Sequence, residues 1–118
     1  MSTMKCKRGD VILVLYPESN LRRAKKRPAL VVQTDNLGTG LSQVIVSMIS
    51  SNIARSGHPS RVEVRINTPP GQQTGLKKDS VFVTDNLATV LDNEINRVIG
   101  TWPDMTAVDA ALRHTLGL

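Results

Sequence analysis

The chain has 118 residues, of which 40% are hydrophobic and 21% are charged, a balance typical of one globular domain and not of a disordered segment. Its longest apolar run, 11–15, is far shorter than the roughly 20 residues of a membrane-spanning helix. The amino terminus lacks the pattern of a secretory signal. Its single cysteine excludes an internal disulfide and fits a reducing compartment. We therefore expect one cytoplasmic domain over residues 1–118, with no membrane partner.

The net charge of +5 is unevenly distributed along the chain. Residues 1–61 carry 10 basic and 3 acidic side chains, a net of +7, whereas residues 62–118 carry 5 basic and 7 acidic ones, a net of −2. This asymmetry predicts one positively charged face that suits a polyanion such as nucleic acid. Ordinary solubility explains the charge equally well, so charge alone leaves both interpretations open.

Short β-branched runs bounded by turn-forming residues predict five strands. They lie at 11–15, 29–33, 44–49, 62–66 and 81–84. The second strand is entered through Arg22-Arg23-Ala24-Lys25-Lys26, which we expect to be a solvated loop, because charge this dense is not buried unpaired. The segment 67–75 contains Pro69-Pro70-Gly71 and is predicted to be a surface loop, since proline cannot extend a strand ladder.

The carboxyl end changes from strand to helix periodicity. A helical turn at 92–95 and a short strand at 97–99 precede an amphipathic helix, whose apolar positions are Met105, Val108, Leu112 and Leu116. Thr101 and Asp104 have the spacing of a capping box, and Gly117 suits the helix end. The predicted fold class is therefore mainly β with helices (α+β), as a small antiparallel barrel or sandwich with a carboxyl-terminal helix.

Several kinds of chemistry have no basis in the sequence. Cys6, His58 and His114 are too widely separated to form a metal-ligand motif. The sequence also lacks a glycine-rich phosphate loop before a helix and a Gly-x-Ser-x-Gly nucleophile motif. We therefore predict no metal and no other cofactor.

Two features remain that could act on a phosphate. Arg27 stands where the basic loop meets a strand, and hydroxyl groups close the third strand at Ser50 and Ser51. A guanidinium and a hydroxyl donor can stabilise a crowded phosphate. RNA suits such a site because it supplies its own nucleophile, the 2′-hydroxyl.

Five segments in order along almost the whole chain carry a family resemblance. They are Lys7–Val11, Arg27–Val32, Val44–Ser50, Gly75–Val81 and Ala111–Leu118. With this order and spacing, the chain resembles the PemK/MazF-type toxins of bacterial type II toxin–antitoxin systems. The resemblance implies a homodimeric, SH3-like barrel of the CcdB/PemK type that acts as a metal-independent endoribonuclease.

The same resemblance implies what such an enzyme does. It cleaves single-stranded RNA, including mRNA, at short sequences and inhibits translation and growth. The 2′-hydroxyl attacks, and a 2′,3′-cyclic phosphate and a 5′-hydroxyl are left. The implied partners are single-stranded RNA, a second copy of the chain, and an antitoxin whose acidic or flexible segment occupies the RNA groove.

Individual residues follow from this match. Arg27 takes the place of the family's catalytic arginine, and Ser50 takes that of its usual threonine. Because the pKa of a guanidinium exceeds about 12, we predict an electrostatic role for Arg27 and leave the general base unassigned. The predicted RNA-binding residues are Arg22, Arg23, Lys25, Lys26, Ser51, Asn52, His58, Asp85 and Asn86.

The chain departs from the family pattern at two further places. The segment before Arg27 lacks the usual Gly-x-Glu signature, and Asp85-Asn86-Leu87-Ala88 stands where an Asp/Glu-Gln pair followed by arginine is expected. Two other functions therefore stay open. One is a CcdB-like toxin that binds DNA gyrase, and the other is a family member that binds RNA or a partner without cutting.

Overall fold

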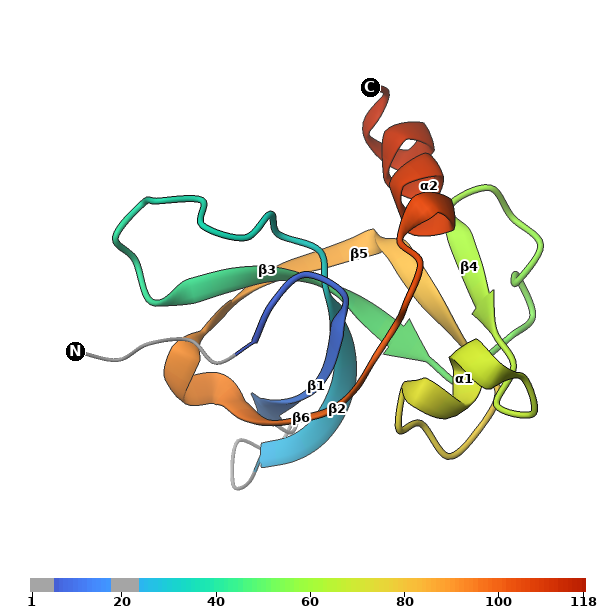
Figure 1. Cartoon of the computed structure of the whole chain (residues 1–118), viewed down its shortest axis with the longest axis horizontal. Helices are drawn as coiled ribbons and strands as arrows, with labels where there is room; N and C mark the ends of the chain where they lie inside the picture. Colours follow the sequence, from blue (N-terminus) through green and yellow to red (C-terminus); the bar gives the residue numbers. More distant parts are fainter. Residues whose placement is uncertain (1–5, 18–23) are drawn as a thin grey trace.

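The structure, a computed structural model, describes residues 6–17 and 24–118 (Figure 1). Arg22 and Arg23, two of the predicted RNA-binding residues, lie outside the described residues. None of the helices in these two ranges is long and apolar enough to cross a membrane.

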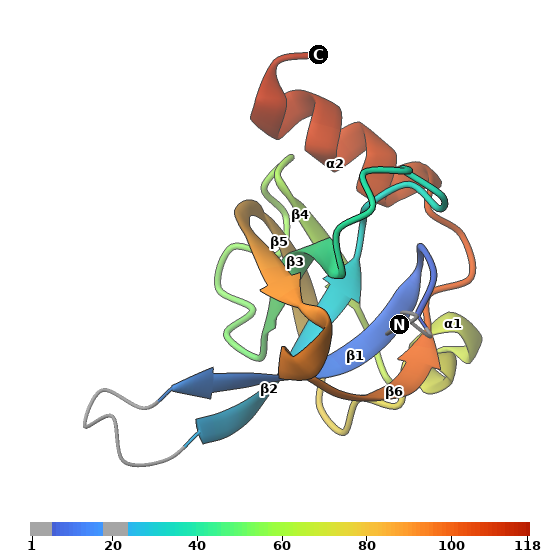
Figure 2. The ribbon, with the colours of Figure 1, turned by 90° about the vertical axis from the view of Figure 1, so that its left-hand side faces the viewer.

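A single curved antiparallel sheet forms the body of the molecule (Figures 1 and 2). Its order is β4-β5-β3-β2-β1-β6, with β1 (Asp10–Pro17), β2 (Ala24–Val31), β3 (Gln43–Ser50), β4 (Arg61–Val64), β5 (Ser80–Leu91) and β6 (Ile95–Thr101). The helical segments are α1 (Pro69–Gln73), η1 (Asp92–Glu94) and α2 (Thr106–Leu116). This confirms the predicted α+β class, mainly β with a carboxyl-terminal helix.

The sheet is not closed into a barrel, in contrast to the prediction. β4 and β6 are its two edges and do not pair with each other. Instead, the segment 65–75 packs between them, and at three glycines an added Cβ would collide with backbone. Gly71 lies against the Arg65 carbonyl, Gly75 against that of Ile99, and Gly100 against that of Thr74. This segment replaces the missing strand pairing, so it is not the simple surface loop that we predicted.

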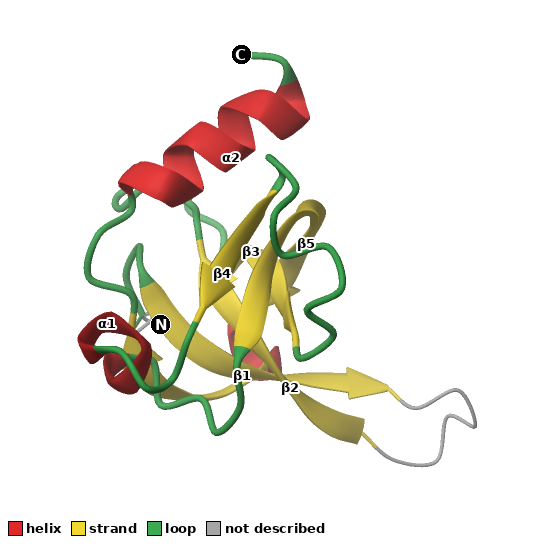
Figure 3. Cartoon of the chain, turned by 90° about the vertical axis from the view of Figure 1, so that its right-hand side faces the viewer, coloured by secondary structure: helices red, strands yellow, loops and turns green. Residues whose placement is uncertain are grey.

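The β1–β2 hairpin is longer than predicted and projects from the body of the sheet (Figures 2 and 3). Lys25 and Lys26 belong to β2 and pair with Tyr16 and Leu15, so the expectation that they form a loop is wrong. The backbone satisfies its hydrogen bonds across the hairpin while both lysine side chains stay exposed. A strand can therefore carry this density of charge without burying it.

β5 also extends beyond its predicted range of 81–84. Ser47 pairs with Leu87 while Met48 pairs with Val83, so the residues at 84–86 form a bulge within the strand. The prediction that 85–88 follow the strand is wrong for this reason. Thr84 at the start of the bulge is fully buried, and its hydroxyl hydrogen-bonds the Thr115 hydroxyl at 2.7 Å, which ties the bulge to α2.

The predicted helix start was placed too early. Thr101 belongs to β6, and Met105 is the N-cap residue of α2. Asp104 supports the first turn in a different way, because its Oδ1 accepts a hydrogen bond from the Thr106 N–H at 3.0 Å. Gly117 ends the helix in the left-handed conformation with φ 72°, as predicted.

Both faces of the central strands are buried. Val11 belongs to a cluster that contains Phe82 and Val108 of α2, whereas its neighbour Ile12 belongs to a second cluster with Val46. Successive residues of a strand point to opposite faces, so a continuous apolar run is what a strand buried on both sides requires. β1 lies between β2 and β6, so the run 11–15 is part of an interior strand.

Candidate functional site

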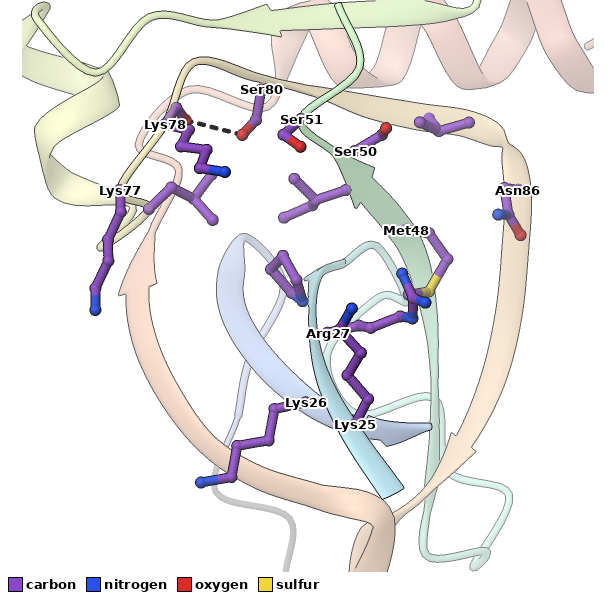
Figure 4. A pocket seen from close by; sticks show the side chains of 14 residues that line it. Lys25, Lys26, Arg27, Met48, Ser50, Ser51, Lys77, Lys78, Ser80 and Asn86 are labelled. Carbon is purple, nitrogen blue, oxygen red and sulfur yellow. Dashed lines mark hydrogen bonds between the residues drawn. The ribbon is translucent and has the colours of Figure 1, made fainter. Parts of the chain in front are cut away.

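A groove of about 690 Å³ lies between β2, the end of β3 and the loop before β5 (Figure 4). Lys25, Lys26 and Arg27 line it from β2, and Lys77 and Lys78 line it from the loop. No aspartate or glutamate is among its lining residues in the described parts of the chain. Five cations and no carboxylate among these described lining residues make the groove suited to a polyanion.

Arg27 is held by β2 and has no fixed partner among the described residues. It pairs with Val14 across the hairpin, and Pro28 after it favours an extended backbone at this position. Its side chain is exposed and extends across the groove in Figure 4. Among the described residues, no hydrogen bond or ion pair engages its guanidinium, which leaves all five N–H donors for a bound anion.

Ser50 ends β3 and lines the same groove. Its Oγ accepts a hydrogen bond from the Asn52 N–H at 3.0 Å, and the Asn52 Oδ1 in turn accepts one from the Ala54 N–H at 3.2 Å. These local side-chain turns fix the end of the strand. Because the backbone donates to the Ser50 oxygen, the hydroxyl proton remains available to a ligand. Ser51 also lines the groove.

A smaller cavity of about 210 Å³ adjoins the groove and shares Ser50, Val83 and Asn86 with it. Asn52 and Arg61 also line this cavity. Thus Asn52 and Asn86, both predicted to bind RNA, lie next to the catalytic candidates.

Asp85 is engaged within the protein. Its carboxylate accepts two hydrogen bonds from Arg61, from Nε to Oδ1 at 3.1 Å and from Nη2 to Oδ2 at 3.2 Å. The hydrogen bond from Arg61 lowers the pKa of Asp85. Among the described residues that line the two cavities, Asp85 is absent.

His58 lies away from both cavities, against α2. Its Nδ1 accepts a hydrogen bond from the Ser60 N–H at 3.1 Å, and its ring meets that of His114 edge to face with 6.0 Å between the centroids. The structure therefore does not bring His58 to Arg27. In the ranges that the structure describes, no three His, Cys, Asp or Glu side chains gather where they could hold a metal ion.

Comparison with known families decides the relationship. The model of the PemK-like, MazF-like toxins of type II toxin–antitoxin systems matches residues 7–116. The chain belongs to this family. The match includes Arg27, Ser50 and both walls of the groove, and it confirms the relationship predicted from the five sequence segments.

Relatives within the PemK/MazF family are similar over nearly the whole chain. The endoribonuclease MazF6 of Mycobacterium tuberculosis (strain CDC 1551 / Oshkosh) is 34% identical over 107 residues, which cover 88% of this chain and 90% of the relative. The endoribonuclease EndoA of Bacillus subtilis (strain 168) is 31% identical over 119 residues, covering 98% and 97%.

Solved structures support the fold. A MazE-MazF structure from Deinococcus radiodurans has a TM-score of 0.72 at 16% identity and covers 96% of this chain and 97% of that one. A mycobacterial endoribonuclease in complex with its cognate antitoxin has a TM-score of 0.70 at 20% identity, with 96% of each chain covered. The open, curved sheet with its terminal helix is thus a MazF-type fold.

Lys77 and Lys78 were not predicted from the sequence as residues of the RNA-binding site. They are about 50 residues from Arg27 in sequence, and the loop before β5 brings them to the opposite side of the groove. The available signal was their place in the segment Gly75–Val81, which carried part of the family resemblance.

Proposed function

We propose that this PemK/MazF-family protein is a toxin endoribonuclease that cleaves single-stranded RNA, including mRNA, at short sequences and thereby inhibits translation and growth. The observation that carries the proposal is Arg27, unpartnered among the described residues and placed with Ser50 in a groove lined by four lysines and no carboxylate. The relatives named as endoribonucleases, at 34% and 31% identity over most of the chain, support it.

The reaction that fits this groove uses the RNA's own nucleophile. The 2′-hydroxyl attacks the adjacent phosphorus and loses its proton, while the bond from phosphorus to the 5′-oxygen breaks and that oxygen gains a proton. A 2′,3′-cyclic phosphate and a 5′-hydroxyl result. No metal is needed, because the protein's tasks are to align the attack and to stabilise the charge on the phosphate.

Arg27 and Ser50 carry these tasks in the proposal. The guanidinium binds the non-bridging oxygens of the crowded phosphate through two parallel N–H donors, and the Ser50 hydroxyl donates a further hydrogen bond. Arg27 does not shuttle protons, since a guanidinium is a permanent cation in proteins. The lysines on both sides of the groove hold the flanking phosphates, and the general base is not assigned to a residue.

The same groove suits an inhibitor. An acidic, flexible antitoxin segment placed between Lys25–Arg27 and Lys77–Lys78 would be attracted by the charges that attract RNA. One structural relative is described in complex with its cognate antitoxin. In this proposal the toxin works as a homodimer in the cytoplasm, where it meets its RNA substrate.

The test is to incubate the purified protein with a long single-stranded RNA, with and without EDTA, and to map the ends. We expect cuts at a recurring short sequence in both conditions, and no cut where the nucleotide before the cleaved bond carries a 2′-deoxy sugar. RNA that is bound without being cut would select the non-catalytic alternative. Inhibition of gyrase supercoiling without RNA cleavage would select the CcdB-like one.

A further inference from the structure

The cavity beside Ser50 has an unusual balance of hydrogen-bonding groups. Its polar side chains come from the end of β3, the loop after it, the start of β4 and the bulge of β5: Ser50, Asn52, Arg55, Arg61 and Asn86. In this set the protein itself uses most of the acceptors and leaves donors free. An excess of free donors over free acceptors favours a ligand that offers acceptors.

Three acceptor groups in or beside the cavity already accept hydrogen bonds from the protein. The Ser50 Oγ accepts the Asn52 N–H, and the Asn52 Oδ1 accepts the Ala54 N–H. The Asp85 carboxylate, which belongs to the adjoining bulge, accepts two hydrogen bonds from Arg61. Each of these oxygens thus has one acceptor position in use within the protein and one left for a ligand.

Besides the Ser50 hydroxyl, two donor groups of the cavity remain without a partner among the described residues. The Asn52 amide uses only its oxygen, so its NH₂ is free, and the Arg55 guanidinium has neither a hydrogen bond nor an ion pair. Both residues are exposed and line the cavity. The Asn86 carboxamide, which has no fixed partner among the described residues, offers both a donor and an acceptor.

The cavity is also in the right place for a base. It meets the phosphate groove at Ser50 and Asn86, and in RNA a base is separated from its phosphate by one ribose. A phosphate held by Arg27 and Ser50 therefore brings a neighbouring nucleotide to the cavity. Flanking nucleotides bound in this way commonly set the specificity of enzymes that act on single strands.

We propose that this cavity binds the nucleobase next to the cleaved phosphate and selects a carbonyl over an amino group at one position of the ring, C4 for uracil over cytosine and C6 for guanine over adenine. The proposal rests on the proposed function, which places RNA in the groove. Donors from Asn52 and Arg55 pair with the carbonyl of uracil or guanine. The amino group of cytosine or adenine would face these donors and would have to pair with the Asn86 oxygen or with an oxygen that already accepts one hydrogen bond, which disfavours the amino base.

The test measures binding separately from cleavage. Oligonucleotides carry a 2′-deoxy sugar at the cleavage site and differ only as U against C, or G against A, at the positions that flank it. Fluorescence anisotropy should show that, at one of these positions, the protein binds the oligonucleotide with U or G roughly tenfold more tightly than the one with C or A. In all-ribose strands of the same sequences, the wild type should show its cleavage preference at this same position.

Asn52→Asp is the decisive variant. Its Oδ1 can still accept the Ala54 N–H, but an acceptor replaces the free NH₂, so the preference for the carbonyl base should vanish or invert. Ser51→Asp is the matched control, because it puts the same charge one residue away in the groove. It should weaken binding of both members of each pair equally and leave their ratio unchanged.

Two results would overturn the inference: equal binding of both members of every pair by the wild type, or an unchanged ratio in Asn52→Asp. If the preference is absent while RNA is cut, only the assignment of the cavity fails. A preference in binding without any cut in all-ribose RNA contradicts the proposed cleavage and supports the cavity. Absence of RNA binding would overturn both.

Discussion

Arginine side chains in this protein differ in whether the fold uses them. Arg8 joins the start of the sheet to α2, because its Nη2 lies 2.5 Å from the Asp109 Oδ1 and its Nε donates to the Val32 carbonyl at 2.9 Å. Arg61 pairs with Asp85. Arg27, by contrast, has no such partner among the described residues, so its charge is available for a ligand.

The cleavage rate should depend on the hydroxyl of residue 50 more than on the size of its side chain. Ser50→Ala should lower the cleavage rate by about 10²- to 10³-fold, the usual cost of losing one donor to a developing oxyanion. Ser50→Thr, which keeps the hydroxyl and introduces the family's usual threonine, should leave cleavage near the wild-type rate. Single-turnover cleavage of one RNA by the three proteins checks this. A Ser50→Ala protein as fast as the wild type would remove Ser50 from the mechanism.

The element that most clearly serves both fold and site is the segment from β4 to β5. Asp79 fixes its two ends together, since its Oδ1 accepts the Ile66 N–H at 3.0 Å and its Oδ2 accepts Arg65 Nη1 at 3.1 Å. Lys77 and Lys78 lie just before Asp79. The packing that bridges the open edges of the sheet therefore also positions one wall of the groove.

Gly71 should not tolerate a side chain. In Gly71→Ala the new Cβ would collide with the Arg65 carbonyl, so the unfolding free energy should fall by about 1–3 kcal/mol, the usual cost of overpacking. Gly57→Ala is the control, because nothing lies within 4 Å of its added Cβ. Denaturant unfolding of the two variants measures the difference. Equal stability would show that the segment shifts without cost.

Asp79 should make stability depend on acid pH. The hydrogen bond from the Ile66 N–H, and then that from Arg65, lower the pKa of Asp79. Its contribution is therefore complete above the unfolded value, about 4, and is lost as pH falls through the lower folded value. Asp79→Asn should be less stable than the wild type at pH 7, and this gap should narrow below about pH 4.

Thermal unfolding of both proteins from pH 7 to pH 3 measures the gap. Asp104→Asn is a useful comparison, since its pKa is also lowered, chiefly by the Thr106 hydroxyl, but it lies outside the bridging segment. An Asp79→Asn gap that stays constant across this range would contradict the assignment.

At the scale of the whole molecule, the charged face does not follow the division of the sequence into basic and acidic halves. Lys25, Lys26 and Arg27 come from the basic half, whereas Lys77 and Lys78 come from the half with a net charge of −2. The curved sheet brings the two sets to one groove. The charge of the basic half of the sequence therefore indicated only one wall of the groove.

The two lysines of the loop should contribute to RNA affinity through charge alone. Lys77→Gln combined with Lys78→Gln should weaken binding of single-stranded RNA of any sequence. The slope of log affinity against log salt should become shallower by about 0.7 for each phosphate that the variant no longer neutralises. Arg113→Gln, on the exposed face of α2 and outside the groove, is the control and should keep the wild-type slope.

Local pattern and long-range pairing explain which predictions were right. The strand at 11–15 and the helix ending at Gly117 follow from short-range periodicity and a helix-stop residue, and the structure has both. Lys25 and Lys26 join a strand because the opposite strand offers backbone partners, which composition does not reveal. Asp85 is held by Arg61, 24 residues away, and such pairings depend on the register of the whole sheet.

The central claim is that Arg27 supplies the charge that cleaves RNA in this groove. The most direct measurement compares the wild type with Arg27→Ala on one single-stranded RNA in EDTA, with product ends analysed and folding checked by thermal unfolding. We predict 5′-hydroxyl and 2′,3′-cyclic phosphate ends from the wild type. The Arg27→Ala protein should unfold at the wild-type temperature and cut at least about 10²-fold more slowly. A folded Arg27→Ala protein that cuts at the wild-type rate would contradict the account.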